Sequence, residues 1–147
     1  MKKLALCGLV CALAVMLSGC GGSDRPPMAK VSGTVTLDDK PIEGASVMFM
    51  PVGGGKPAYG VTDAAGRFNL TTYETGDGAL VGDHQVTITK KEVSGVIVTE
   101  DGVSGGIAPE GIQEKWIIPE RYSSPETSQL KQTVSPKMEP IEFKLTQ

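Results

Sequence analysis

Apolar and polar residues alternate along much of the chain, beginning at position 31. Val31, Val35 and Leu37 share one face of a predicted strand with Gly33, and Ser or Thr occupies each position between them. This period of two is typical of a half-buried strand. The alternation recurs between turns rich in Asp, Gly and Pro, and it predicts seven strands at about 31–37, 45–50, 59–62, 67–72, 83–90, 127–134 and 141–145.

Short strands, frequent turn signals and no run at helical spacing after residue 20 predict an all-β fold, a seven-stranded antiparallel β-sandwich. We expect strands 59–62 and 67–72 to form a hairpin around the turn 63–66. Both faces of strand 45–50 are apolar, which predicts a central position or a covered outer side. The weaker pattern at 91–115 predicts a variable loop or hairpin.

The N-terminal segment has a different pattern. Two lysines precede the uncharged apolar run Leu4–Leu17, which is too short to span a bilayer and has the length of a secretory h-region. The run closes in Leu17-Ser18-Gly19-Cys20. We expect a signal peptide at 1–19, a flexible tether rich in Gly, Ser and Pro at 20–29, and one folded domain at 30–147.

The tetrad that ends at Cys20 resembles the lipobox of bacterial lipoproteins. That resemblance implies cleavage after Gly19, a diacylglycerol on the Cys20 thiol and an acyl chain on its new amine. Anchoring by acyl chains needs more than one chain, which such a cysteine would supply. An ordinary secretory peptide is the alternative, but the Ala-x-Ala pattern is missing. Gly21, where an inner-membrane signal would have Asp, favours the outer membrane.

Composition restricts the partners and the sources of stability. Cys7 and Cys11 lie in the predicted signal peptide and Cys20 in the lipobox, so the mature domain would hold no disulfide. Without residues 1–19 the net charge falls from −3 to −5, because both Lys2 and Lys3 are lost. No basic patch is present, which argues against a nucleic-acid partner.

Seven segments of the domain together carry a family pattern. They are Val31–Leu37, Lys40–Ala45, Gly60–Phe68, Gly76–Ala79, Gly82–Ile88, Ile118–Tyr122 and Thr127–Leu130. In these segments the chain resembles the carboxypeptidase regulatory-like family, whose fold is a transthyretin-like, or prealbumin-like, β-sandwich related in shape to Ig domains. The resemblance covers about 30–90 and 116–145 and leaves 91–115 uncovered. It implies an accessory domain without peptidase activity.

Candidate catalytic chemistry is sparse. The single histidine, His84, cannot supply the two histidines of a zinc peptidase site. A Ser-His-Asp arrangement through His84 lacks the Gly-x-Ser-x-Gly elbow. The C-terminus does not carry the Tyr-Arg-Gly-Ser of transthyretin-like hydrolases. We therefore interpret His84 as a strand-edge residue near Asp83, and we expect no enzyme, no metal and no cofactor.

For the other candidate sites, a structural role explains the residues better than a functional role does. The acidic pairs Asp38–Asp39, Asp77–Asp83 and Glu100–Asp101 lack the dense spacing of a calcium loop. Gly55-Lys56-Pro57 fails as a phosphate loop. Asn69 is poorly placed for an isopeptide crosslink. The aromatic residues Tyr59, Tyr73, Trp116 and Tyr122 could stack on a carbohydrate, but packing is favoured, and Tyr122 suits a corner whose hydroxyl bonds the backbone.

These observations predict a lipid-anchored cell-envelope protein, attached to the membrane through acyl chains on Cys20. Its β-sandwich is expected to be a non-catalytic structural or binding module. The alternatives are a module that binds carbohydrate or peptidoglycan, and a small hydrolase that uses His84. A further envelope protein or glycan as partner has no signature in the sequence.

Overall fold

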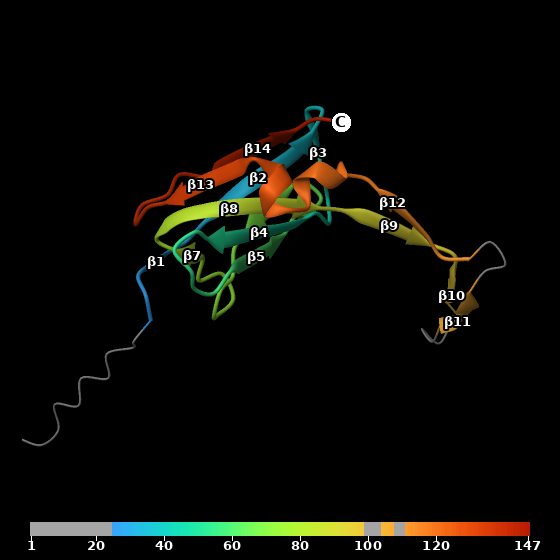
Figure 1. The fold of residues 1–147 in the computed structure, drawn as a ribbon, viewed down its shortest axis with the longest axis horizontal. Coiled ribbons are helices and arrows are strands. Elements are labelled where there is room, and N and C mark those ends of the chain that lie inside the picture. The colour runs from blue at the N-terminus through green and yellow to red at the C-terminus, as the bar shows by residue number, and fades with distance from the viewer. Residues whose placement is uncertain (1–24, 99–103, 108–110) are drawn as a thin grey trace, which may run out of the picture.

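The structure, a computed structural model, describes residues 25–98, 104–107 and 111–147 (Figure 1). A 3-10 helix, η2 (Glu120–Tyr122), and one helical turn, α1 (Pro125–Ser128), are the helical elements within these ranges. The remaining regular structure is β-strand, which confirms the all-β prediction.

The larger antiparallel sheet has the strand order β13-β8-β4-β5. Its members are β13 (Leu130–Val134), β8 (Gly82–Thr89), β4 (Ser46–Pro51) and β5 (Ala58–Val61). Strand β4 lies between β8 and β5, as the apolar residues on both of its faces predicted.

The second sheet is built on β2 (Ser32–Leu37), which pairs with β14 (Ile141–Leu145) on one side. The short β3 (Lys40–Pro41) and β6 (Arg67–Asn69) both pair with β2 in antiparallel fashion. The β14–β2 pair is parallel, which differs from the antiparallel prediction. The connection 135–140 carries the chain from one sheet to the other, so β14 has no hairpin partner to impose an antiparallel direction.

The predicted hairpin of 59–62 with 67–72 is wrong in its pairing. Strand β5 belongs to the larger sheet and β6 to the second sheet, and a single bridge between Tyr59 and Thr71 joins the two segments. The turn between them is nevertheless built as its residues suggest. The Asp63 carboxylate accepts hydrogen bonds from the N–H groups of Ala65 at 2.9 Å and Arg67 at 2.8 Å. This turn therefore passes the chain between sheets.

The predicted strand at 127–134 is too long at its start. Ser124 accepts a hydrogen bond from the Glu126 N–H and Pro125 occupies the first helical position, so the segment opens as the helical turn α1. Gln129 then has φ of 55°. This left-handed residue ends the turn, and β13 begins at Leu130.

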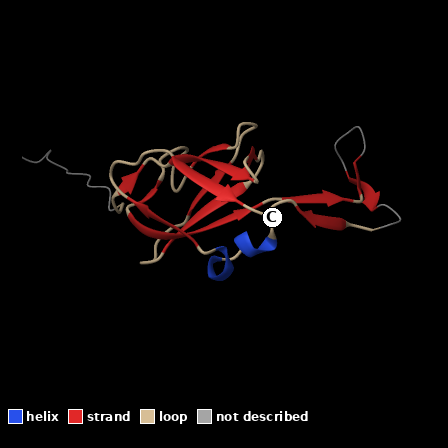
Figure 2. Ribbon diagram, turned by 90° about the horizontal axis from the view of Figure 1, so that it is seen from above, coloured by secondary structure: helices blue, strands red, loops and turns tan. Residues whose placement is uncertain are grey.

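Two further pairs complete the strands. Strand β1 (Met28–Ala29) pairs with β7 (Ala79–Leu80) beside the larger sheet. The predicted loop or hairpin at 91–115 is a ribbon that projects from the body (Figures 1 and 2). The ribbon consists of β9 (Lys91–Ser94) with β12 (Gln113–Trp116) and, farther out, β10 (Val96–Val98) with β11 (Ser104–Ile107). We call residues 91–98, 104–107 and 111–116 the arm.

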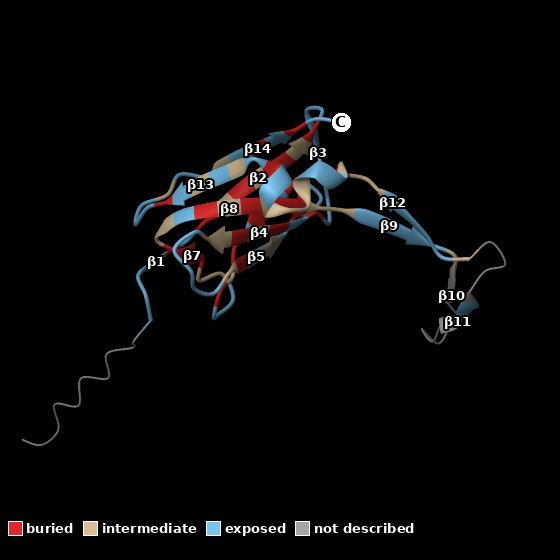
Figure 3. Cartoon of the chain, viewed as in Figure 1, coloured by how far each residue is buried: buried red, intermediate tan, exposed pale blue. Residues whose placement is uncertain are grey.

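One hydrophobic core joins the two main sheets. Phe49 on β4 lies 6.1 Å from Phe143 on β14, ring centre to ring centre, and Phe143 lies 6.2 Å from Phe68 on β6. All three rings are buried, and Figure 3 shows the buried residues concentrated on these strands rather than on the arm. Every residue of the core cluster lies between Ala29 and Leu145, so a chain without the N-terminal segment keeps the whole core.

Gly33 permits this packing. A Cβ atom at Gly33 would lie 2.3 Å from the Ile141 carbonyl oxygen and 2.8 Å from the Phe68 ring. We therefore expect Gly33→Ala to destabilise the protein by about 1–3 kcal/mol, the usual cost of forcing atoms into a packed core. Urea unfolding of the chain from residue 21 onward measures this change. Gly53→Ala is the matched control, because a Cβ there meets nothing within 4 Å. Equal losses in both variants would contradict this account.

Candidate functional site

His84 lies in the interior of the larger sheet, not at its edge. Strand β8 is flanked by β13 on one side and β4 on the other. The His84 side chain is 1% exposed, and its ring centre is 5.7 Å from that of Phe49. The interpretation of His84 as a strand-edge residue is wrong, because its side chain continues the inward row of Val86 and Ile88 into the core.

The hydrogen bond of His84 shows which ring nitrogen carries a proton. Nδ1 is 3.0 Å from the Gly82 carbonyl oxygen, which can only accept, so Nδ1 carries the proton. Nε2 is buried and has no hydrogen-bond partner among the described residues. Burial lowers the pKa of His84 below its ordinary value, although the Gly82 carbonyl and the Asp83 charge oppose the change. The imidazole is therefore neutral at physiological pH.

No catalytic relay reaches this imidazole in the part of the chain that the structure describes. The neighbouring carboxylate, Asp83, accepts a hydrogen bond of 2.6 Å from the Thr133 hydroxyl instead. Because side chains alternate along a strand, Asp83 and His84 point to opposite faces of β8. A general base would need both a nucleophile and an orienting group within hydrogen-bond reach. Neither is present at His84 among the described residues.

Two hollows lie beside this end of β8. One, of about 420 Å³, is lined by β8 and β13 and includes Gln85 and Lys131. The other, of about 410 Å³, lies between the loop Gly53–Gly55 and the segment Leu80–Asp83. His84 borders both. The Gly53–Gly55 loop connects β4 to β5 and opens no helix, so it lacks the geometry of a phosphate loop.

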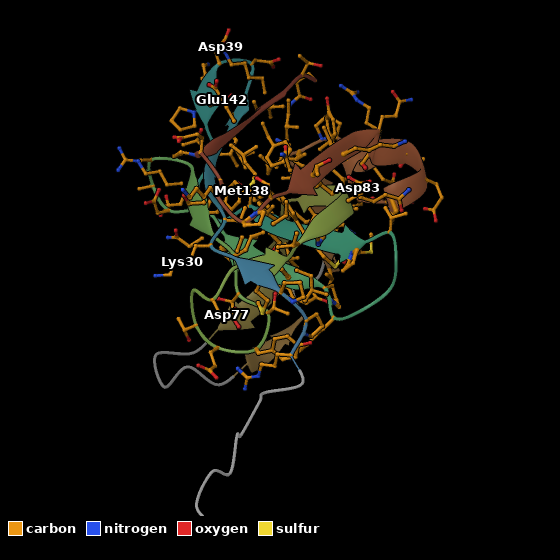
Figure 4. All side chains as sticks on the ribbon, turned by 90° about the vertical axis from the view of Figure 1, so that its left-hand side faces the viewer. Lys30, Asp39, Asp77, Asp83, Met138 and Glu142 are labelled. Carbon is orange, nitrogen blue, oxygen red and sulfur yellow. The ribbon has the colours of Figure 1, made fainter. Side chains whose placement is uncertain are left out.

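The Asp77 carboxylate binds backbone N–H groups of its own loop. The Asp77 carboxylate accepts hydrogen bonds from the N–H groups of Thr72, Tyr73 and Glu74 at 2.7, 2.9 and 2.8 Å. Burial alone raises the pKa of Asp77, but these donors bring it below its ordinary value. Figure 4 shows Asp77 and Asp83 well apart, so this pair does not form one site.

Of the other two acidic pairs, Asp38–Asp39 is the one that lies within the described residues. Asp38 and Asp39, with φ of 49° and 63°, form the two-residue turn between β2 and β3. Glu100 and Asp101 lie outside the described residues. Within the described ranges, no group of three or more His, Cys, Asp or Glu side chains could hold a metal ion.

The four aromatic candidates lie at separate places, and three of them pair with cations. Lys91 Nζ lies 4.1 Å from the centre of the Trp116 ring, and Lys56 Nζ lies 4.7 Å from that of Tyr73. Tyr122 contacts Arg121, and its hydroxyl accepts a hydrogen bond of 3.3 Å from the Thr146 N–H, the corner role expected of it. Tyr59 lies on β5. The ring pairs found in the described residues include none of these four.

Sequence reasoning missed the arm as an element that projects from the body. Its inner part pairs Lys91 with Trp116 and Val93 with Glu114, and Lys91 forms an ion pair of 2.9 Å with Glu114. Apart from the half-buried Trp116, residues of both inner strands are exposed (Figure 3). The signal was the Val- and Ile-rich composition of 91–112. The pairing of β9 with β12 could not be deduced from the sequence, because β10 and β11, which pair with each other, lie between them in the chain.

The predicted signal peptide 1–19, Cys20 and the first part of the tether lie outside the described residues. In residues 25–98, 104–107 and 111–147, none of the helices has the length and hydropathy to cross a membrane.

Because the folded protein keeps His84 neutral, the unfolded chain takes up its proton first as pH falls. We expect the free energy of unfolding to decrease as pH falls through about 6.5, the ordinary histidine value, towards the lower value of the folded state. Urea unfolding at about pH 7.5 and about pH 5.5 compares the two sides of the ordinary histidine value. His84→Gln retains an N–H donor for the Gly82 carbonyl but does not titrate. This variant should therefore lose less unfolding free energy than the unaltered protein between the two pH values. The same loss in both proteins would exclude His84 as the cause.

The described residues thus contain an isolated buried imidazole, acidic side chains that bond the backbone, and a projecting arm. Of these, the arm is the element whose side chains are open to a partner. Comparisons of the chain with protein-family models, with curated proteins and with solved structures found no match.

Proposed function

We propose that this chain is a lipid-anchored cell-envelope protein whose transthyretin-like, seven-stranded β-sandwich acts as a non-catalytic binding or structural module. The Leu17–Cys20 tetrad supports the anchor. For the sandwich, support comes from the two main sheets and their shared core, with β2, β4, β5, β6, β8, β13 and β14 corresponding to the seven predicted strands.

The exposed apolar residues of the arm are the observation that supports a binding role. A compact β-domain that served only as a spacer would have no need of a ribbon whose apolar residues face solvent. Val93 and Ile112 are 57% and 54% exposed. Monomeric proteins seldom keep such residues together on a projecting element unless a partner covers them.

The chemistry around His84 supports a non-catalytic role over the hydrolase alternative. The imidazole is buried and its one hydrogen bond goes to a backbone carbonyl. Stability explains these features, since the ring completes the core beside Phe49. The hydrolase alternative would require a nucleophile and an open approach to Nε2.

The carbohydrate-binding alternative has less support than protein binding. Sugar recognition by stacking needs aromatic faces that are open and close together. Trp116 and Tyr73 each have a cation over the ring, and the two residues belong to the arm and to the body respectively. A protein partner fits the elongated, mixed apolar and ionic arm better.

Lipid anchoring is tested on the mature protein from a bacterial envelope fraction. We expect its intact mass to equal residues 20–147 plus a diacylglyceryl group and an N-acyl chain. The physical reason is that two or more chains are needed for stable attachment, at ~0.8 kcal/mol per buried CH₂. Cys20→Ala removes the acceptor thiol and should leave a protein without lipid. An unmodified N-terminus at any other residue would sink the anchoring proposal.

A further inference from the structure

Residues 25–29, the second half of the predicted tether, lie against the body. The Pro27 carbonyl oxygen accepts a hydrogen bond of 2.9 Å from the Val81 N–H. Beyond it, β1 pairs with β7, and a Cβ atom at Gly78 would lie only 1.8 Å from the Ala29 carbonyl oxygen. The two backbones are in close contact there, so the chain is fixed to the body from Pro27 onward.

Only a short stretch then separates this fixed point from the anchor proposed at Cys20. Seven residue steps lead from Cys20 to Pro27, and a fully extended chain covers at most about 25 Å in that number. As a flexible coil the same stretch spans roughly 15 Å on average. A lipid-anchored Cys20 would therefore keep the part of the body around Pro27 close to the membrane surface.

The arm begins at the opposite end of the body. Strand β8 starts at Gly82, next to Val81, and runs for 8 residues before the arm begins at Lys91. A strand of that length extends about 26 Å. In both Figure 1 and Figure 2, the chain enters the body at one end and the arm leaves it at the other. A membrane close to Pro27 would therefore lie at the end of the body that is far from the arm.

Exposed side chains surround the point where the chain joins the body. Pro26 borders a hollow of about 410 Å³ whose lining includes Val52 and the glycines that follow it. Val52 is 67% exposed. The Arg25 guanidinium lies 5.3 Å from the centre of the Tyr73 ring, and Tyr73 is 37% exposed. We call residues 52–56 and Tyr73 the tether end.

The charges at the tether end balance. Arg25 and Lys56 both lie near the Tyr73 ring, the second with its Nζ 4.7 Å from the ring centre. Arg25 forms an ion pair of 2.7 Å with Glu74, and the Asp77 carboxylate accepts hydrogen bonds from the N–H groups of Tyr73 and Glu74. Two cations and two carboxylates give no net attraction to anionic lipid, so the anchor and not charge would place this surface. An exposed Tyr ring is suited to the headgroup region.

The arm likewise has no charge that would draw it to the membrane. Among its described residues, Lys91 and Lys115 are balanced by Glu92 and Glu114. Lys91 and Glu114 also form an ion pair of 2.9 Å with each other. The position of the arm relative to the membrane would therefore follow from where the chain is tied to the body.

We propose that the tether end rests on the headgroups of the membrane that holds Cys20, and that the arm extends from the far end of the body into the aqueous compartment. Because this orientation rests on the lipid anchor of the proposed function, its test has to supply the anchor independently of the cell. A partner of the arm would then approach from the aqueous side and not from the lipid.

Tryptophan fluorescence tests the orientation, because Trp116, the single tryptophan, lies at the base of the arm opposite Lys91. The chain from residue 20 has one thiol, that of Cys20, which can be coupled to a maleimide-bearing phosphatidylethanolamine. Vesicles of phosphatidylethanolamine, phosphatidylglycerol and this lipid, with a spin-label quencher on some headgroups, hold the protein at the proposed anchor residue. We expect Trp116 to keep its full fluorescence on coupling.

A reporter on the tether end should behave in the opposite way. Val52→Trp combined with Trp116→Phe puts the only tryptophan at an exposed position of the tether end, and it should lose most of its fluorescence on coupling. Val61→Trp in the same background is the matched control, because Val61 is 64% exposed. It lies opposite Ser46, which pairs on its other side with Thr89 at the arm end of β8. This control should not be quenched.

Three results would overturn the proposal. Quenching of Trp116 or of Val61→Trp would show that the body lies on its side. Full fluorescence of Val52→Trp would show that the tether end stays clear of the lipid. Equal quenching of Val52→Trp in the cysteine-free chain from residue 21 would show that the tether does not place this end.

These outcomes do not depend on lipidation in the cell, because the coupling supplies the anchor chemically. Failure of the orientation would leave the anchoring proposal standing. An unmodified N-terminus of the mature protein would refute the anchor whatever the fluorescence shows.

Discussion

Contact between the two main sheets is the constraint on which the rest of the body depends. The chain has three phenylalanines, and all three take part: Phe49 from the larger sheet meets Phe143 from the second, and Phe143 meets Phe68. No cysteine follows Cys20, so packing has to supply what a disulfide supplies in many small extracellular domains. Gly33 is part of the same joint, since only a residue without a side chain leaves room there for the Phe68 ring.

Structural roles also account for most of the described side chains that could act in catalysis or bind a metal. The one histidine fills the core beside Phe49, the Asp63 and Asp77 carboxylates hold turns, and the Tyr122 hydroxyl ties a corner to the last strand. Each is a residue type that could act in catalysis or bind metal, but each has been given a backbone or packing partner. Among the described residues, exposed apolar side chains lie on the arm, at Val93 and Ile112, and on β5, at Tyr59 and Val61.

The sequence by itself determined the strand-rich class, the positions of most strands and the Asp63 turn, because these depend on local alternation and on side chains that bond their own backbone. For β4 the apolar residues on both faces left two possibilities, a central position or a covered outer side. The proposal for Cys20 also depends on the sequence alone, because it is drawn from four adjacent residues. Only the tertiary structure decided that β5 and β6 separate into different sheets, that β14 runs parallel to β2, that His84 is internal, and that 91–116 forms an arm. Each of these depends on which distant strands pair, and period-two alternation shows which face of a strand is buried but does not identify its neighbours.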